Sequence, residues 1–234
     1  MCLMQDFQVL ALTPGALDGY WLIACEETAT VRAEFEALGI KVISCDLKAS
    51  RKEGPHYQGD VRDIVWLHRW AGIIAHPVCR YLTNAGVRWL FQKARDASKV
   101  TGDARWQAMR EAAEFFKLFE QVAEFWDCPL AVENPIPHKY AVELIGRKYD
   151  QLIQPYHFGH LESKAICLWL RNLPKLIHTN DVKQEMLALP KRLTHKVHYA
   201  SSALKDREEV RSEFFAGIAK AFAQQWVTTH HNTR

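Results

Sequence analysis

The 234-residue sequence lacks several features that would restrict its class at once. Its six cysteines include no C-x-x-C pair, which excludes the usual zinc-ribbon spacing and argues against a dense disulfide framework. No run of about 18 apolar residues occurs, and the N-terminal segment carries Asp6 without a basic leader. We therefore expect a reduced, cytoplasmic protein without a membrane span or a signal peptide.

The sequence also lacks a strong charge bias and an internal repeat. Its 30 lysine and arginine residues against 27 acidic residues give a net charge of +3, which permits contact with nucleic acid without demanding it. The 48% hydrophobic and 24% charged residues are typical of a soluble globular protein. The length supports one sizeable core, so we expect a single domain over residues 1–234.

Short apolar runs alternate with amphipathic segments along the chain. Strands buried on both faces are predicted at 20–25, 41–45, 71–75 and 130–132. Helices are predicted at 29–38, around 63–70, at 103–126 and at 213–226, a loop at 49–59, and a strand pair at 151–158 and 165–170. Strand, helix and strand in close succession form a βαβ unit. The sequence thus predicts an α/β fold with a mostly parallel central sheet and helices on both faces.

Three chemically functional side chains follow the apolar runs. Asp46, Cys79 and Glu133 each come after a predicted strand, and the carboxyl ends of parallel strands meet at one edge of a sheet. A thiol near a helix start can have a lowered pKa, and a protonated carboxyl beside it can act as an acid. This pair suits nucleophilic attack on an electron-poor ring. The alternative is that Cys79 is a small buried hydrophobe and Glu133 caps a helix.

Two of these strand ends carry a family resemblance. AHPVC at 75–79 resembles the Pro-Pro-Cys segment of the DNA cytosine-5 methyltransferases, and VENP at 132–135 resembles their Glu-Asn-Val segment. From about Leu22 to Trp226 the chain is similar to the small cytosine-methyltransferase-like proteins of bacteriophages and prophages, through the further blocks ACEE, SCD, GDV, QPYHFGH, KAICLWL and GIAKAFAQQW. The resemblance implies a Rossmann-like methyltransferase fold that binds S-adenosylmethionine (SAM), in the host cytoplasm if the protein is phage-encoded.

The resemblance also implies roles for individual residues. Cys79 would attack C6 of cytosine, and Glu133 would bond N3 and the amino group. Asn134 would help to orient Glu133 and the loop that bears Cys79. SAM would lie against the first strand–helix turn, with Asp46 on the ribose hydroxyls and Asp60 near the adenine. The implied cofactor contacts are Ala24, Cys25, Glu26, Glu27, Thr28, Asp46, Asp60, His76 and Pro77.

Three positions depart from the family's pattern. The turn after the first strand is Ala-Cys-Glu-Glu-Thr instead of glycine-rich, which suits the positively charged end of SAM or a different ligand. Val78 replaces a proline, so the loop that presents the thiol is less rigid. Lys164 is the catalytic candidate at the place where the family has an arginine-rich segment that contacts the target base. Its ammonium group supplies positive charge but cannot donate the two parallel hydrogen bonds of an arginine. The alternative for Lys164 is a solvated lysine at a strand start.

A large DNA-recognition domain is missing. Only the short basic insert at 171–212 stands in its place, and about 40 residues cannot hold a large domain. We expect phosphate contacts from Arg80, Arg88, Lys191, Arg192 and Lys196. The alternative for the basic insert is an ordinary solvated loop.

Three functions remain open. The first is methylation of C5 of cytosine in DNA, with sequence specificity that is low or supplied by a protein partner. The second is modification of a free pyrimidine nucleotide. The third is binding of nucleic acid or a host protein without catalysis, as in an anti-restriction protein. The first is favoured because neither Cys79 nor Glu133 is replaced.

The histidines indicate no metal site in the sequence. His157 and His160 lie near Cys167, but their spacing is not that of a metal site, so we expect packing roles and no bound metal. His76 and His138 flank the two segments of the resemblance and are expected to line the site.

Overall fold

The computed structural model describes residues 3–92, 100–196 and 214–231. A seven-stranded sheet forms its centre, in the order β3-β2-β1-β4-β5-β7-β6. The strands are β1 (Trp21–Ala24), β2 (Val42–Asp46), β3 (His56–Gln58), β4 (Gly72–Ala75), β5 (Leu130–Asn134), β6 (Gln151–Ile153) and β7 (Ile166–Arg171). Neighbours from β3 to β5 pair in parallel, whereas β7 is antiparallel to both β5 and β6. The predicted mostly parallel sheet is confirmed.

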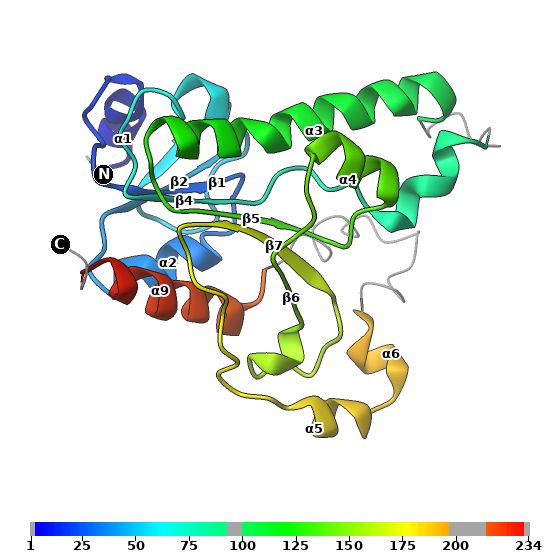
Figure 1. Ribbon diagram of the computed structural model, residues 1–234. Coiled ribbons are helices and arrows are strands. Elements are labelled where there is room, and N and C mark those ends of the chain that lie inside the picture. Colours follow the sequence, from blue (N-terminus) through cyan, green and yellow to red (C-terminus); the bar gives the residue numbers. More distant parts are fainter. Residues whose placement is uncertain (1–2, 93–99, 197–213, 232–234) are drawn as a thin grey trace.

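Helices cover both faces of this sheet, as predicted (Figure 1). One face carries α1 (Leu3–Leu12), α3 (Gly102–Phe125) and α4 (Lys139–Ile145), and the other carries α2 (Thr30–Ala37) and α9 (Ala216–His231). Shorter helices are η1 (Val61–Asp63), η2 (Asn84–Leu90), η3 (Pro155–His157), α5 (Lys183–Leu187) and α6 (Lys191–Thr194).

The central strands contribute to two hydrophobic cores because successive side chains point to opposite faces. Leu22 is fully buried in the core that contains Phe119 of α3, and the next residue, Ile23, is fully buried in the core that contains Phe222 of α9. Burial on both sides explains why these strands are unbroken apolar runs in the sequence.

Several element predictions were wrong. The segment 49–59 is not only a loop, because His56 and Tyr57 are buried in β3, which pairs with β2. No helix covers 63–70: η1 ends at Asp63, and turns follow in which Trp70 Nε1 donates to the carbonyl of Val65. The strand expected at 151–158 stops at Ile153, since Pro155 begins η3. Helices α1, η2 and α4 were not predicted.

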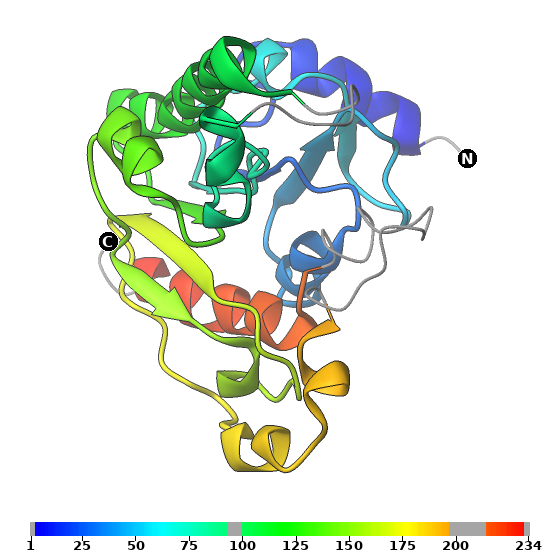
Figure 2. The same ribbon diagram turned by 90° about the vertical axis from the view of Figure 1, so that its right-hand side faces the viewer.

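The described part of the 171–212 insert ends at residue 196 and contains α5 and α6. Together with η3, these helices form a small lobe below the sheet in both ribbon views (Figures 1 and 2). The rest of the insert lies outside the described residues. No helix in the described part of the chain is long and apolar enough to cross a membrane.

Candidate active site at the strand ends

The register of the central strands brings several polar side chains into one row. Ala24 of β1 pairs with Cys45 of β2 and with Ala75 of β4. Ala75 pairs in turn with Val132 of β5. The next residue on each strand therefore lies in the same row at the carboxyl edge of the sheet, in the order Asp46, Cys25, His76 and Glu133. Asp46 and Glu133 thus lie at the same edge of the sheet, as predicted, with Cys25 and His76 between them in the row.

His76 contacts the carboxyl group of Glu133. His76 Nδ1 lies 3.2 Å from Glu133 Oε2, with 13% and 15% of the two side chains exposed. The other ring nitrogen, Nε2, is buried without a hydrogen-bond partner among the described residues, and the ring packs edge-on against Phe214. The resemblance implies that His76 contacts the cofactor. In the structure, His76 contacts Glu133, the carboxyl that the resemblance implies as catalytic.

Asn134 links the end of β5 to the segment that presents Cys79. Its side chain is 1% exposed, and Nδ2 donates to the carbonyl of Pro77 at 3.3 Å. Cys79 follows two residues later, is half-buried, and accepts a backbone bond from Leu82 at its carbonyl. This geometry agrees with the positioning role expected of Asn134. We call His76, Cys79, Glu133 and Asn134 the strand-end cluster.

Glu133 does not cap a helix, so that alternative was wrong. It belongs to β5, and the cap of the following helix α4 is His138, whose Nδ1 accepts the N–H of Ala141 at 3.1 Å. His138 Nε2 lies 3.2 Å from the carbonyl of Tyr81, and its backbone N–H donates to Leu82. His138 therefore joins α4 to the segment after Cys79.

The turn after β1 uses one of its acidic side chains inside the fold. Cys25 and Ala29 have positive φ angles of 61° and 55°, which sharpen the turn into α2. The Glu26 carboxylate is 4% exposed and accepts the N–H groups of Val31 at 2.6 Å and Arg32 at 3.2 Å. Burial raises the pKa of Glu26, opposed by these bonds and by the nearby His76. Glu26 therefore takes the free backbone donors at the start of α2.

The next acidic residue faces a neighbouring loop. Glu27 Oε1 lies 2.8 Å from Arg51 and 3.2 Å from Lys48. Partial burial works against ionisation, but these two cations lower the pKa of Glu27. Thr28 Oγ1 accepts the N–H of Thr30 at 3.4 Å. The implied cofactor contacts at Glu26, Glu27 and Thr28 thus have partners within the chain.

Two carboxylates gather around the thiol of Cys25. Burial, together with the smaller effect of the Asp46 and Asp60 charges, raises the pKa of Cys25 to about 12. Asp46 Oδ1 accepts the N–H of Lys48 at 2.9 Å, and Asp60 caps η1 and pairs with Arg62. The structure therefore brings together Cys25, Asp46 and Asp60, and keeps Cys25 a neutral thiol.

Lys164 lies beside the segment that precedes α9. Its backbone N–H donates to Gln154 Oε1 at 3.1 Å, and its Nζ lies 5.4 Å from the ring centroid of Phe215. The adjacent Phe214 packs on His76. Phe214 and Phe215, which are adjacent in the chain, therefore contact His76 and Lys164, respectively.

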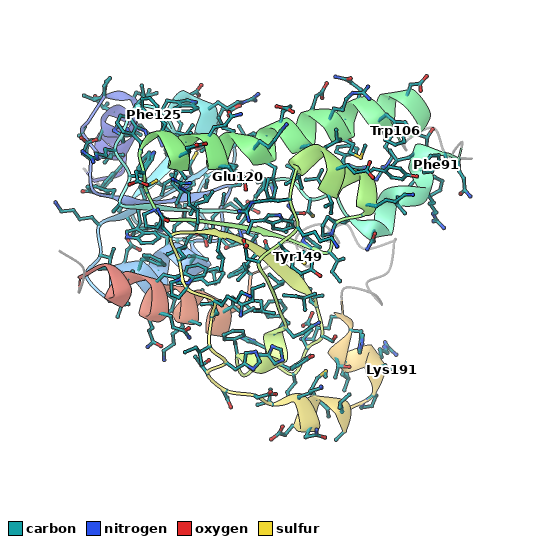
Figure 3. The ribbon with its side chains drawn as sticks, in the orientation of Figure 1. Phe91, Trp106, Glu120, Phe125, Tyr149 and Lys191 are labelled. Atoms are coloured by element: carbon teal, nitrogen blue, oxygen red, sulfur yellow. The ribbon has the colours of Figure 1, made fainter. Side chains whose placement is uncertain are left out.

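The predicted phosphate contacts fall into two exposed groups. Arg80 and Arg88 follow β4, and the Arg88 guanidinium lies 4.5 Å from the Trp89 ring centroid. Lys191 (Figure 3), Arg192 and Lys196 belong to the lobe, where Lys196 pairs with Glu162 at 3.6 Å. Helix α6, which contains Lys191 and Arg192, is at the lower right of Figure 1.

Sequence reasoning missed the His76–Glu133 pair and an aromatic cluster. Phe91, Trp106 and Tyr140 form this cluster from three elements, with ring centroids 5.2–5.8 Å apart (Figure 3). The His76–Glu133 pair could have been predicted only from the register of the strands. No local sequence pattern indicates the aromatic cluster. A depression of about 330 Å³ lies elsewhere and is lined by other residues, including Phe158 and Asn180.

No family model and no curated protein matches this chain.

Proposed function

We propose that the protein is a SAM-dependent methyltransferase that acts on C5 of cytosine in DNA, with Cys79 as nucleophile and Glu133 as the acid. The observation that carries the proposal is the strand-end cluster. Glu133 is held by His76, and Asn134 holds the Pro77 carbonyl next to the Cys79 segment. A thiol and an oriented carboxyl at one sheet edge suit addition to a pyrimidine ring.

The sheet supports the same proposal. The order β3-β2-β1-β4-β5 matches the doubly wound dinucleotide-binding order, and it places ligands beyond the carboxyl ends of the strands. The antiparallel β7 between β5 and β6 departs from that order. Such an inserted strand agrees with the methyltransferase fold that the resemblance implies.

The first turn fits SAM better than a nucleotide phosphate. In dinucleotide-binding folds, backbone N–H groups at the first helix start bind phosphate. Here Glu26 occupies the N–H groups of Val31 and Arg32, so a phosphate would meet a carboxylate instead of free donors. SAM has no phosphate and carries positive charge. The residues that would hold it are the 24–28 turn, with Asp46 for the ribose hydroxyls and Asp60 nearby.

The chain's own residues would divide the reaction between them. The Cys79 thiolate adds to C6 as Glu133 gives a proton to N3, which makes C5 nucleophilic. His76 keeps Oε2 of Glu133 in place, which leaves Oε1 to face the base. When bound, SAM supplies the methyl group as an electrophile. Loss of the C5 proton to water, departure of the Cys79 thiolate from C6 and return of the N3 proton to Glu133 would then restore the aromatic ring, with S-adenosylhomocysteine as the other product.

DNA as the substrate requires the base to reach this edge. A cytosine in a duplex must leave the stack, and exposed basic residues on both sides of the site can hold the backbone by contacts that salt weakens. Arg80 and Arg88 would act from the β4 side and Lys191, Arg192 and Lys196 from the lobe. Sequence specificity would then be low or come from a protein partner.

The test is transfer of label from methyl-labelled SAM to DNA, RNA and free pyrimidine nucleotides. We expect label on cytosine in DNA, falling with added salt, and abolished in Cys79→Ala. The matched control is Cys128→Ala, whose thiol is buried in the core away from the row. Label on free nucleotides alone would identify a nucleotide-modifying enzyme. Binding of nucleic acid or of a host protein without any label would instead identify a non-catalytic binding protein.

A further inference from the structure

Three potential metal ligands meet in the lobe. His157 ends η3, whereas His178 and Asp181 lie in the segment between β7 and α5. One ligand atom from each of these side chains lies within 4.8 Å of the others. None of the three belongs to the strand-end cluster, and for His157 the sequence pattern predicted a packing role and no bound metal. His160, the other histidine of this region, is turned away, because its Nε2 accepts the N–H of Gly217.

The backbone fixes the two segments against each other. The N–H groups of Thr179 and Asn180 both donate to the carbonyl of His157 at 3.2 Å, and Val182 donates to Tyr156 at 2.8 Å. The first two donors lie between His178 and Asp181 in the chain, and Val182 follows Asp181 directly. The chain therefore holds the positions of the three ligands before any ion binds, which reduces the ordering that binding requires.

The two imidazole rings are stacked. Their centroids lie 3.6 Å apart and their planes are within 12° of parallel. Parallel rings point their lone pairs in parallel directions, so an ion needs one ring to turn. His178 and Asp181 are exposed and have room to move, whereas His157 is half-buried. Binding is therefore expected to open the stack by movement of His178.

Asp181 and His157 each accept a hydrogen bond from a backbone N–H group in the structure. Asp181 Oδ1 accepts the N–H of Lys183 at 3.0 Å, which orients the carboxylate. His157 Nδ1 accepts the N–H of Gln154 at 3.3 Å, a long bond that an ion bound at Nε2 would break by moving the ring proton to Nδ1. The nearest cation, Lys183, extends toward the Tyr156 ring, with its Nζ 6.0 Å from the centroid.

We propose that His157, His178 and Asp181 bind one divalent transition-metal ion of the zinc class, with water completing the coordination. The two imidazole nitrogens are borderline ligands that favour Zn²⁺, Co²⁺ and Ni²⁺ over Mg²⁺ or Ca²⁺, and zinc also accepts a carboxylate oxygen. The ion joins η3 to the segment before α5. It therefore stiffens the lobe that carries Lys191 and Arg192.

The test is titration of chelator-treated protein with ZnCl₂ by calorimetry and with CoCl₂ by absorption. We expect saturation at one equivalent and a cobalt spectrum without a sulfur-to-metal band, which separates this site from cysteine binding. His178→Ala and Asp181→Asn should each weaken binding by more than about 10-fold, the lower range of loss when only an outer partner is removed. Both side chains are exposed, so circular dichroism should report unchanged folding.

Two control variants sharpen this test. Lys183→Ala removes a nearby charge without removing a ligand and should bind zinc at least as tightly as the natural sequence. His195→Ala removes a histidine of the same lobe outside the cluster and should leave binding unchanged. Absence of saturable binding, a sulfur-to-cobalt band, or equal affinity in His178→Ala and Asp181→Asn would overturn the proposal.

Discussion

His76 and Glu133 face each other across the β4–β5 pair, with Nδ1 3.2 Å from Oε2. The contact restrains the carboxyl that we propose as the acid. His76→Ala should therefore lower turnover by roughly 10²-fold, because a catalytic group misplaced by about 1 Å has a cost of this order. SAM affinity should stay the same. Steady-state kinetics and calorimetric SAM binding measure the two quantities separately.

A conservative variant shows which role His76 has. His76→Asn offers a side-chain donor near the same place and should recover part of the turnover lost in His76→Ala. A parallel loss of SAM affinity would instead place His76 in the cofactor site, as the family resemblance implies.

Asp46→Asn tests the cofactor assignment. An ionised acceptor for ribose hydroxyls contributes about 1.5–3 kcal/mol, so SAM affinity should fall about 10- to 100-fold. The matched control is Asp63→Asn. Asp63 is the last residue of η1, and its carboxylate accepts a hydrogen bond from the Tyr57 hydroxyl at 3.3 Å. Unchanged SAM affinity in Asp46→Asn would remove Asp46 from the cofactor site.

Arg32 determines the position of the loop beside the cofactor residues. It is 1% exposed, and its guanidinium donates to the carbonyls of Lys52, Glu53 and Pro55 at 2.7–3.0 Å. Arg32→Leu leaves these carbonyls without their donor and removes the ion pair of Arg32 with Glu36 at 3.4 Å, so the free energy of unfolding should fall by about 3–5 kcal/mol. Denaturant unfolding measures the change.

The control for Arg32 is Arg62, whose ion pair with Asp60 is exposed. Arg62→Leu should change the free energy of unfolding by less than about 1 kcal/mol. Equal effects of the two substitutions would show that burial of Arg32 does not matter.

Acid should destabilise the protein through its histidines. Burial lowers the pKa of His56, His68, His138 and His160 below the ordinary 6.5. The unfolded chain therefore binds more protons as pH falls below about 6.5, and stability decreases by about 1.4 kcal/mol per pH unit for each histidine until its folded pKa is reached. Glu26, whose pKa is raised, acts in the opposite direction with one proton.

A single histidine variant tests this pH dependence. His68 is fully buried between the N–H of Leu17 and the carbonyl of Ala11. In His68→Gln, the decrease of unfolding free energy between pH 7 and 5 should be smaller than in the natural sequence. An identical decrease would contradict the assignment.

The sequence was informative where the structure depends on regular burial. The apolar runs at 20–25 and 71–75 predicted two of the parallel strands, because both faces of these strands are covered. The same pattern predicted that Asp46 and Glu133 share an edge. β3 escaped detection because it contributes only three residues at the sheet border, two of them the atypical core members His56 and Tyr57.

Contacts between distant segments could not be predicted in this way. The bond of Glu26 to α2 depends on the sharp turn at Cys25, which no composition signals. The meeting of His157 with His178 depends on how the segment after β7 returns along η3. In both cases backbone geometry decides the partner, and the residue types alone do not.

The contact of Phe214 with His76 has a consequence for synthesis. A chain emerging from the ribosome exposes Cys79 and Glu133 long before residue 214, and domains fold as their segments become available. The core below the sheet also requires Phe222 and Trp226 of α9. A nascent chain that has not reached these residues therefore lacks both a packed sheet face and one side of the His76 environment, so the strand-end cluster is completed late in translation.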